Sequence, residues 1–179
     1  HTDLHYLDHG VKPFKAPPLV LGHEIAGTVA GVGAGVTERA AGDRVLIPSV
    51  YGCGRCEFCR HGRENLCVGM VMLGNNIDGG YAEFGRFPGD WLIPLPKGLT
   101  LFEAGALGVA GHTAALAIDL MQLNGLTPAK GKVLVNGATG GVASVAIDIL
   151  AKLGFHVVAM SGKSDQHDYL RMLGASEIV

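Results

Sequence analysis

What this sequence lacks excludes several classes of partner and location. Charged residues make up 17% of its 179 residues, and the formal net charge is −2 with acidic and basic residues interspersed. This argues against a nucleic-acid partner, which would need a basic face. Its apolar runs are shorter than a membrane span, and no stretch resembles a secretory signal. Cysteine is absent outside residues 53–67. These absences predict a cytoplasmic protein that binds neither nucleic acid nor membrane.

Apolar residues and glycine, by contrast, are abundant. Hydrophobic residues make up 48% of the chain, and its 28 glycines recur singly at turns instead of forming a low-complexity tract. This composition is typical of a globular protein with many short strands followed by an α/β segment. A chain of this length can bury a core as one large domain or two small ones.

All four cysteines lie in one segment, residues 52–67. They are Cys53, Cys56, Cys59 and Cys67, separated by two, two and seven residues. Four thiolates in a short, glycine-punctuated loop can surround Zn²⁺ as a tetrahedron, in a closed structural site that does no chemistry. The alternatives are four ordinary buried thiols or two disulfides, and disulfides would require an exported chain. The spacing favours structural zinc.

The first half of the chain also shows a pattern of short strands. Residues 19–36 combine apolar runs with glycines and predict bent strands of a small β-barrel. Residues 43–48, 79–84 and 91–96 predict three more strands, and residues 102–107 predict a short helical turn.

Within this region Gly22, His23, Glu24 and Gly27 form the run Gly-His-Glu-x-x-Gly. Together with the cysteine segment that follows, this run resembles the zinc-dependent alcohol dehydrogenases of the medium-chain dehydrogenase/reductase superfamily. The resemblance implies a GroES-like catalytic domain over residues 1–108, with a structural zinc lobe at residues 52–67.

The same resemblance assigns roles to polar residues of the first half. It implies that His23 binds a catalytic zinc, with Glu24 close to the metal as a substitute ligand. It implies that Asp3 orients the ligating imidazole, that Thr2 accepts the alcohol proton, and that His5 passes this proton to solvent.

Two ligands of the family pattern have no counterpart here. The family's first zinc-ligand cysteine directly precedes the His-Thr-Asp run, which opens this chain at His1, and the third falls at Val109. A catalytic zinc needs three protein ligands, so we expect about one zinc per chain, in the cysteine site. The resemblance also places His1 near the cofactor pyrophosphate. The chain is expected to be truncated at both ends, because it opens inside this motif and stops at Val179, where a strand begins.

From about residue 85 the resemblance changes. Residues 90–96, residues 108–114 and everything after Gly131 resemble the acrylyl-CoA reductase type of NADPH quinone oxidoreductase, a branch that generally has no zinc. The two resemblances meet near residues 80–85, at a Gly-Gly-Tyr-Ala pattern that both branches share. A fusion of the two branches is one hypothesis that explains the missing ligand.

The second half predicts a βαβ unit. A helix over residues 112–121 precedes it, and apolar strands at 132–136 and 155–160 flank a helix that Gly154 closes. A helix over 165–173 and a third strand from Ala175 follow. This pattern predicts the first half of a Rossmann fold, so residues 109–179 form a partial dinucleotide-binding domain.

The turn after the first of these strands is the predicted cofactor site. Its amides, at the start of a helix, would hold a pyrophosphate. Its residues are Gly137, Ala138, Thr139, Gly140, Gly141 and Val142. After the second strand the sequence has Ser161 and Lys163 but no acid before Asp165. A hydroxyl and a cation suit a 2′-phosphate, which a carboxylate would repel, so these residues predict NADP(H).

The sequence as a whole predicts an α/β-plus-β chain, a GroES-like β-barrel domain followed by half a Rossmann fold. The predicted function is hydride transfer between NADP(H) and a small alcohol or carbonyl compound. The alternatives are zinc-free reduction of an activated alkene and a non-catalytic zinc-binding fragment. The strand at Val133–Val135 is expected at a sheet edge that carries no proline or lysine there, so we expect a homo-oligomer or self-association through this edge.

Overall fold

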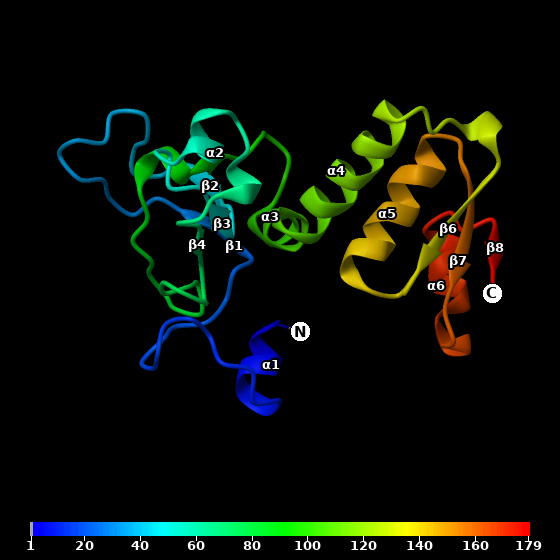
Figure 1. Cartoon of the computed structure of the whole chain (residues 1–179), viewed down its shortest axis with the longest axis horizontal. Helices are drawn as coiled ribbons and strands as arrows, with labels where there is room; N and C mark the ends of the chain where they lie inside the picture. The colour runs from blue at the N-terminus through cyan, green and yellow to red at the C-terminus, as the bar shows by residue number, and fades with distance from the viewer. Residues whose placement is uncertain (1) are drawn as a thin grey trace. The chain divides into compact units, whose positions relative to one another are not determined.

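Short antiparallel strands form the first of the two units into which the chain divides, His1–Val109 and Ala110–Val179 (Figure 1). The computed structural model describes residues 2–179. One sheet has the order β1-β2-β5, from β1 (Ile25–Thr28), β2 (Arg44–Ile47) and β5 (Ile93–Pro94). A second pairs β3 (Val50–Tyr51) with β4 (Val71–Met72). Alternate residues of a strand share a face, so Val45 and Ile47 of β2 are buried together, in a core that includes Leu73.

The helices of the first unit are short. They are α1 (Thr2–Asp8), α2 (Glu57–Arg60), α3 (Leu101–Gly108) and the 3₁₀ turns Glu64–Leu66 and Gly89–Trp91. A reciprocal cap starts α3, because the Thr100 hydroxyl accepts from the Glu103 N–H at 3.2 Å and the Glu103 carboxylate accepts from the Thr100 N–H at 2.8 Å. The helix contacts β1 and β2 and buries Ala104.

Two predicted strands of this unit differ from the structure. Residues 79–81 donate their N–H groups to the carbonyls of residues 20–22, but residues 79–84 form no strand. The predicted strand over 91–96 is reduced to β5, because Trp91 ends a 3₁₀ turn. The long stretch 19–36 contributes only β1 to the sheet.

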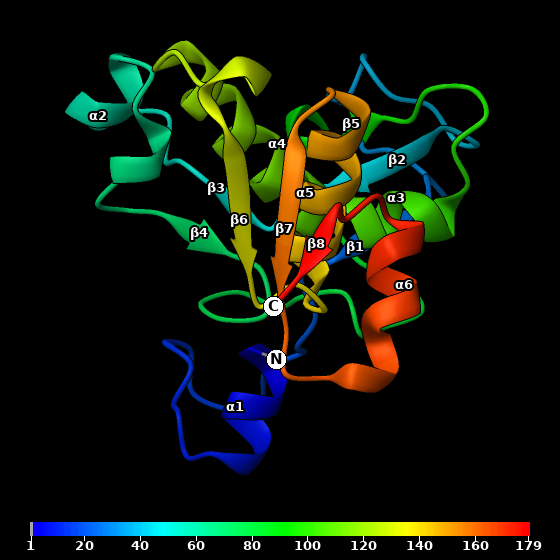
Figure 2. The ribbon, with the colours of Figure 1, turned by 90° about the vertical axis from the view of Figure 1, so that its right-hand side faces the viewer.

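The second unit is a parallel sheet with helices. Its strands β6 (Lys132–Asn136), β7 (His156–Met160) and β8 (Glu177–Ile178) lie side by side in the order β6-β7-β8 (Figure 2). Its helices are α4 (Ala110–Leu123), α5 (Gly141–Lys152) and α6 (His167–Met172), with 3₁₀ turns at Pro128–Lys130 and Ser164–Gln166. Ile147 and Leu150 of α5, Val157 of β7 and Leu170 of α6 are fully buried in one core.

The elements of this unit follow the sequence prediction with shifted ends. α4 begins two residues earlier and ends two residues later than predicted, and the predicted helix 165–173 divides into a 3₁₀ turn and α6. Within residues 2–179 no single helix is long and apolar enough to cross a membrane. The consecutive helices α3 and α4 meet this length and composition only if they are treated as one segment, and a bend separates them.

Candidate functional sites

The four cysteines converge as their spacing predicts. Their Sγ atoms all lie within 4.8 Å of one another. The Cys56 sulfur is 3.5 Å from that of Cys59 and 3.8 Å from that of Cys67, far beyond the length of about 2.05 Å that a disulfide requires. A Zn–S bond of about 2.3 Å in a tetrahedral site implies sulfur–sulfur distances of about 3.8 Å. The four thiols therefore fit a structural zinc.

Backbone amides surround these sulfurs. The Cys53 N–H donates to the Cys67 sulfur at 3.2 Å, and the Cys56 N–H donates to the Cys53 sulfur at 3.4 Å. Amide donors from Arg55 and Cys56 lower the pKa of the Cys53 thiol to about 6, because they stabilise the thiolate form. Thiolates are the form that binds a metal, so the loop favours this form at Cys53. Burial raises the pKa of the Cys59 thiol to about 12, so that sulfur would lose its proton only on binding the metal.

A second polar site surrounds His23, just before β1. The His23 Nδ1 lies 3.6 Å from Oδ2 of Asp3, and both side chains are largely buried. Asp3 is fixed from α1, where its Oδ1 accepts the Gly22 N–H at 3.2 Å. Asp3 therefore lies on the Nδ1 side of the imidazole, a position from which a carboxylate can orient the ring.

Tyr81 completes this group and is not identified by the sequence analysis. Its hydroxyl donates to Oδ2 of Asp3 at 3.4 Å. The charge of Asp3, followed by partial desolvation, raises the pKa of the Tyr81 phenol, and Glu24 adds to this effect. Two carboxyl groups, an imidazole and a phenol therefore lie close together, contributed by three separate parts of the chain.

Close backbone packing holds the turn that carries His23. Gly22 has a φ of +94°, and a Cβ there would lie 2.6 Å from the Tyr81 ring. A Cβ at Gly74 would lie 2.9 Å from the Gly22 nitrogen, and one at Gly79 only 2.0 Å from the Gly22 oxygen. Each of these positions therefore requires glycine.

The other residues that the resemblance assigns to catalysis lie elsewhere or contribute no ligand. Thr2 and His5 are exposed on α1, where the His5 ring lies 5.0 Å from that of His9. Glu24 is exposed. His1 lies outside the described residues. Across residues 2–179 the only group of three or more metal-ligating side chains is the cysteine group, so the described residues do not fit a catalytic zinc at His23.

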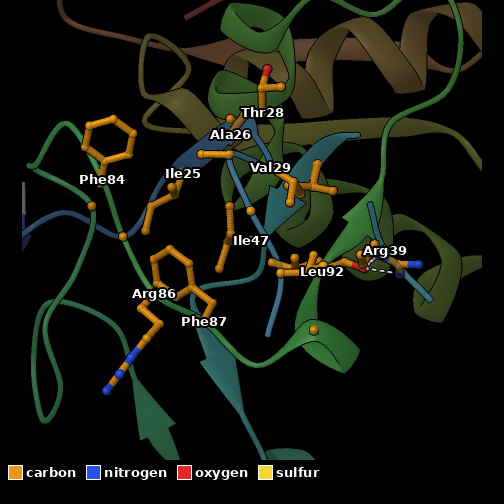
Figure 3. Close-up of a pocket in the computed structure, with 18 of the residues that line it drawn as sticks. Ile25, Ala26, Thr28, Val29, Arg39, Ile47, Phe84, Arg86, Phe87 and Leu92 are labelled. Carbon is orange, nitrogen blue, oxygen red and sulfur yellow. Dashed lines mark hydrogen bonds between the residues drawn. The ribbon is translucent and has the colours of Figure 1, made fainter. Parts of the chain in front are cut away.

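A cavity of about 350 Å³ lies beside β1 in the first unit (Figure 3). Ile25, Ile47 and Phe87 line it with apolar side chains, and the Arg39 guanidinium is bound to the Leu92 carbonyl. The cavity lies between β1 and residues 82–87, which overlap the end of the stretch 79–84 where the predicted strand does not form.

The predicted phosphate-binding turn joins β6 to α5. Gly137 has a φ of +61°, and its carbonyl accepts the Gly140 N–H at 2.8 Å, which closes the turn. Gly140 then caps α5, and the exposed Gly141 and Val142 begin the helix. Amides in the first turn of a helix have no carbonyl partner within it. The turn therefore presents a helix N-terminus that can bind an anion.

The other two residues of this turn have different surroundings. Ala138 is completely buried, and its N–H donates to the Met160 carbonyl at 3.1 Å. Thr139 is half-buried. Ala138 therefore anchors the turn to β7.

Ser161 and Lys163 lie at the same end of the sheet as this turn, where the parallel strands have their carboxyl ends. Asn136 is in register with Met160, so the turn and the Ser161 loop both follow the carboxyl ends of neighbouring parallel strands. The Ser161 hydroxyl accepts the Lys163 N–H at 3.2 Å, and Lys163 is exposed. Ligands of open α/β sheets bind outside the carboxyl ends of the strands.

Comparison with known proteins identifies relatives of both kinds that the sequence resembles. Residues 1–97 match the family described as the alcohol dehydrogenase GroES-like domain. The acrylyl-CoA reductase AcuI of Ruegeria pomeroyi is 52% identical over 137 residues, which cover 74% of this chain and 42% of that protein.

Two crystal structures extend this likeness to the fold. An NAD-dependent alcohol dehydrogenase matches with a TM-score of 0.87 at 37% identity, over 100% of this chain and 51% of that one. The YhdH oxidoreductase of Salmonella enterica in complex with NADP matches with a TM-score of 0.78 at 36% identity, over 99% of this chain and 48% of that one. The chain thus spans about half the length of these proteins. The predicted fold class is confirmed.

Proposed function

This chain belongs to the alcohol dehydrogenase GroES-like domain family, and from that premise we propose that the protein is a nicotinamide-dependent oxidoreductase. A bound nicotinamide supplies or accepts a hydride. The role of the described residues is to bind the dinucleotide in the second unit and to provide polar groups in the first.

The observation that carries this proposal is the turn between β6 and α5. Its glycines allow a close backbone approach, and the exposed residues Gly141 and Val142 begin a helix of 12 residues. A pyrophosphate bound there gains both hydrogen bonds and the favourable end of the helix dipole. The likeness to an oxidoreductase structure that holds NADP supports the same assignment.

We further propose that the cofactor is NADP(H). Ser161 and the exposed Lys163 follow β7, and no carboxylate precedes Asp165. The Asp165 side chain already accepts from the Gln166 amide at 3.0 Å. A hydroxyl and an ammonium group would bind a 2′-phosphate, whereas an acid at this place would select the 2′-hydroxyl of NAD(H).

Calorimetry with NADPH and NADH on the whole chain tests both statements. We expect tighter binding of NADPH, and Lys163→Glu should remove or reverse this preference by placing a carboxylate beside the phosphate. Lys130→Glu is the matched control, because it makes the same charge change in the turn before β6, at the amino-terminal end of the strands. Equal affinities for the two cofactors in the unmutated chain would contradict the NADP(H) assignment, and no binding of either would contradict the dinucleotide site.

For the substrate we propose a small alcohol or carbonyl compound, which the pairing of His23 with Asp3 favours. A hydroxyl substrate needs a path for its proton, and an imidazole oriented by a carboxylate can hold one. Because the described residues provide no third metal ligand beside His23, this proposal includes no step through a catalytic zinc.

Reduction of an activated alkene is the second candidate, and the likeness to an acrylyl-CoA reductase favours it. A non-catalytic zinc-binding protein is the third. Hydride-transfer assays with an alcohol, an aldehyde and an enoyl thioester, together with the metal content, distinguish the three. The His23→Ala variant should lose alcohol oxidation but retain alkene reduction, since only the first reaction uses the imidazole in this scheme.

A further inference from the structure

Two exposed histidines lie one helical turn apart at the end of α1. They are His5 and His9, and their ring centres are 5.0 Å apart with the ring planes tilted by 60°. Residues four apart lie on the same face of a helix, and two histidines with this spacing are a recurring arrangement for holding a metal ion. We propose that this pair is a second metal site, which binds a divalent transition cation of the class of Ni²⁺, Cu²⁺ and Zn²⁺. Binding there requires neither a nicotinamide nor hydride transfer.

The backbone fixes the spacing of the two rings. The His5 carbonyl accepts the His9 N–H at 3.2 Å, which is the hydrogen bond of a complete helical turn. Gly10 follows with a φ of +69°, a conformation in which helices commonly end. His9 is therefore the last residue that the helical turn holds. The geometry of the pair depends on residues 5–10 alone.

The distance between the rings fits a shared metal. A metal bonded at about 2.1 Å to one imidazole nitrogen lies about 3.2 Å from the centre of that ring. Two rings bonded to one metal at an angle between about 90° and 109° therefore have centres about 4.5–5.3 Å apart. The observed separation of 5.0 Å lies within this range. The pair can therefore close on a metal by rotating its side chains, without a change in the backbone.

The donor atoms select the class of metal. Imidazole nitrogens suit Zn²⁺, Cu²⁺ and Ni²⁺, whereas Ca²⁺ and Mg²⁺ prefer oxygen ligands. Asp8, three residues after His5, is the last residue of α1 and places a negative charge on the same side of the helix. That charge favours a bound cation. Across residues 2–179 no group of three ligands forms around the pair, so water molecules would complete the coordination.

The histidine pair and the cysteine lobe should hold a metal with different strength. Two imidazoles bind a metal much more weakly than four thiolates do, so the ion at the pair should exchange with solvent and be lost on dialysis. The dialysed chain should therefore still contain about one zinc, in the closed cysteine site.

Titration of the whole chain with Ni²⁺ tests the proposal, after the cysteine site has been filled with Zn²⁺ and the excess has been removed. Calorimetry should show one saturable Ni²⁺ site per chain near neutral pH. His9→Ala should weaken this binding by at least about tenfold, since even the hydrogen-bond partners of metal ligands contribute that much. His112→Ala is the matched control, because His112 is exposed on α4 and has no histidine three or four residues away.

A second variant separates the geometry of the pair from the number of histidines. A chain with both His9→Ala and Leu7→His keeps the same number of imidazoles, but residues two apart do not face each other on a helix. This chain should bind Ni²⁺ as weakly as His9→Ala alone. Leu7 is 68% exposed, so its replacement removes no buried contact. The Gly22 amide donates to Asp3 of α1, and its chemical shift reports whether α1 keeps its place in each variant.

Paramagnetic broadening by Ni²⁺ locates the ion without any variant. The ring signals of His5 and His9 should broaden at the lowest Ni²⁺ additions, before those of His23 and His112. Earlier broadening at His23 would place the ion elsewhere and overturn the proposal. So would the lack of a saturable site, equal weakening by His9→Ala and His112→Ala, or undiminished binding by the chain that combines His9→Ala with Leu7→His.

Discussion

Replacing Cys59 with serine should remove the zinc and unfold the cysteine lobe while leaving the rest of the chain folded. Within residues 52–67 the only buried residues are Cys59 and Cys67, so the lobe has no apolar core of its own. Ordering the backbone costs about 1–2 kcal/mol per residue, and little apolar burial offsets this cost. Metal binding, which stabilises comparable loops by on the order of 10 kcal/mol, must supply most of the difference.

The assay combines zinc content with hydrogen exchange. The unmutated chain should hold about one zinc, and Cys59→Ser should hold almost none and lose amide protection across residues 52–67, because three sulfurs do not close the tetrahedron. Protection of β2 and β7 should persist, since their cores lie outside the lobe. His61→Ala is the control, because this nearby imidazole is bound to the Glu57 carbonyl and lies outside the sulfur group.

Acidification should release the same zinc. Amide donors lower the pKa of the free Cys53 thiol to about 6, whereas burial raises the pKa of the free Cys59 thiol to about 12. Protons therefore compete with the metal at Cys59 throughout the neutral range and at Cys53 as well below about pH 6, so the affinity for zinc should fall as the pH falls, and more steeply in acid. Either of two results would refute this reasoning: a Cys59→Ser chain that retains one zinc, or an unmutated chain that binds two.

Two further predictions concern stability, and urea unfolding measures both. Gly79→Ala should destabilise the first unit by about 3 kcal/mol or more, because the added Cβ would lie 2.0 Å from the Gly22 oxygen. Gly33→Ala is the control and should have little effect, because its Cβ would meet no atom within 4 Å. Similar losses of stability in both variants would contradict the packing argument. The hydrogen bond from Lys132, followed by that from His156, lowers the pKa of the Glu177 carboxyl in the folded chain. In the unfolded chain this pKa is about 4.3. The stabilisation from the carboxylate is therefore fully present above a pH of about 4.3 and is lost as the pH falls through the lower folded-state pKa. The urea midpoint of the unmutated chain should accordingly exceed that of Glu177→Gln by less in acid than at neutral pH. A difference between the two midpoints that stays constant down to a pH well below 4 would contradict this stabilising role of Glu177.

Local patterns in the sequence were sufficient for the zinc lobe and for the phosphate turn. The four cysteines lie within a single loop, so their spacing alone determines whether the sulfurs can meet. The turn at Gly137 likewise depends on adjacent residues, whose glycines and following apolar spacing determine both the turn and α5. Both features depend on residues that are close together in the sequence. Residue spacing and periodicity report on such local contacts, so they can be predicted.

Contacts between distant residues were not predictable in this way. The Tyr81 hydroxyl reaches Asp3 across 78 positions, and nothing in the sequence near Tyr81 indicates that contact. The strand predicted over residues 79–84 is wrong for a related reason. Its alternating pattern fits a strand, but Gly79 and Tyr81 are bound to residues 20–22 and Phe84 is 72% exposed. Tertiary packing here overrides the local preference.

The glycines around His23 affect how far the Gly-His-Glu-x-x-Gly run can be taken as a metal signature. Gly22 is required by its positive φ and by the Tyr81 ring above it, and Gly74 and Gly79 pack against its backbone. These requirements come from the fold and would remain if no metal were ever bound at His23. In this run only His23 and Glu24 carry metal-binding atoms, and the described residues bring no third ligand to them. Of the two glycines in the run, the fold therefore requires Gly22, whereas a Cβ at Gly27 would meet no atom within 4 Å. Gly22 in this run indicates the fold and is not by itself evidence of a catalytic zinc.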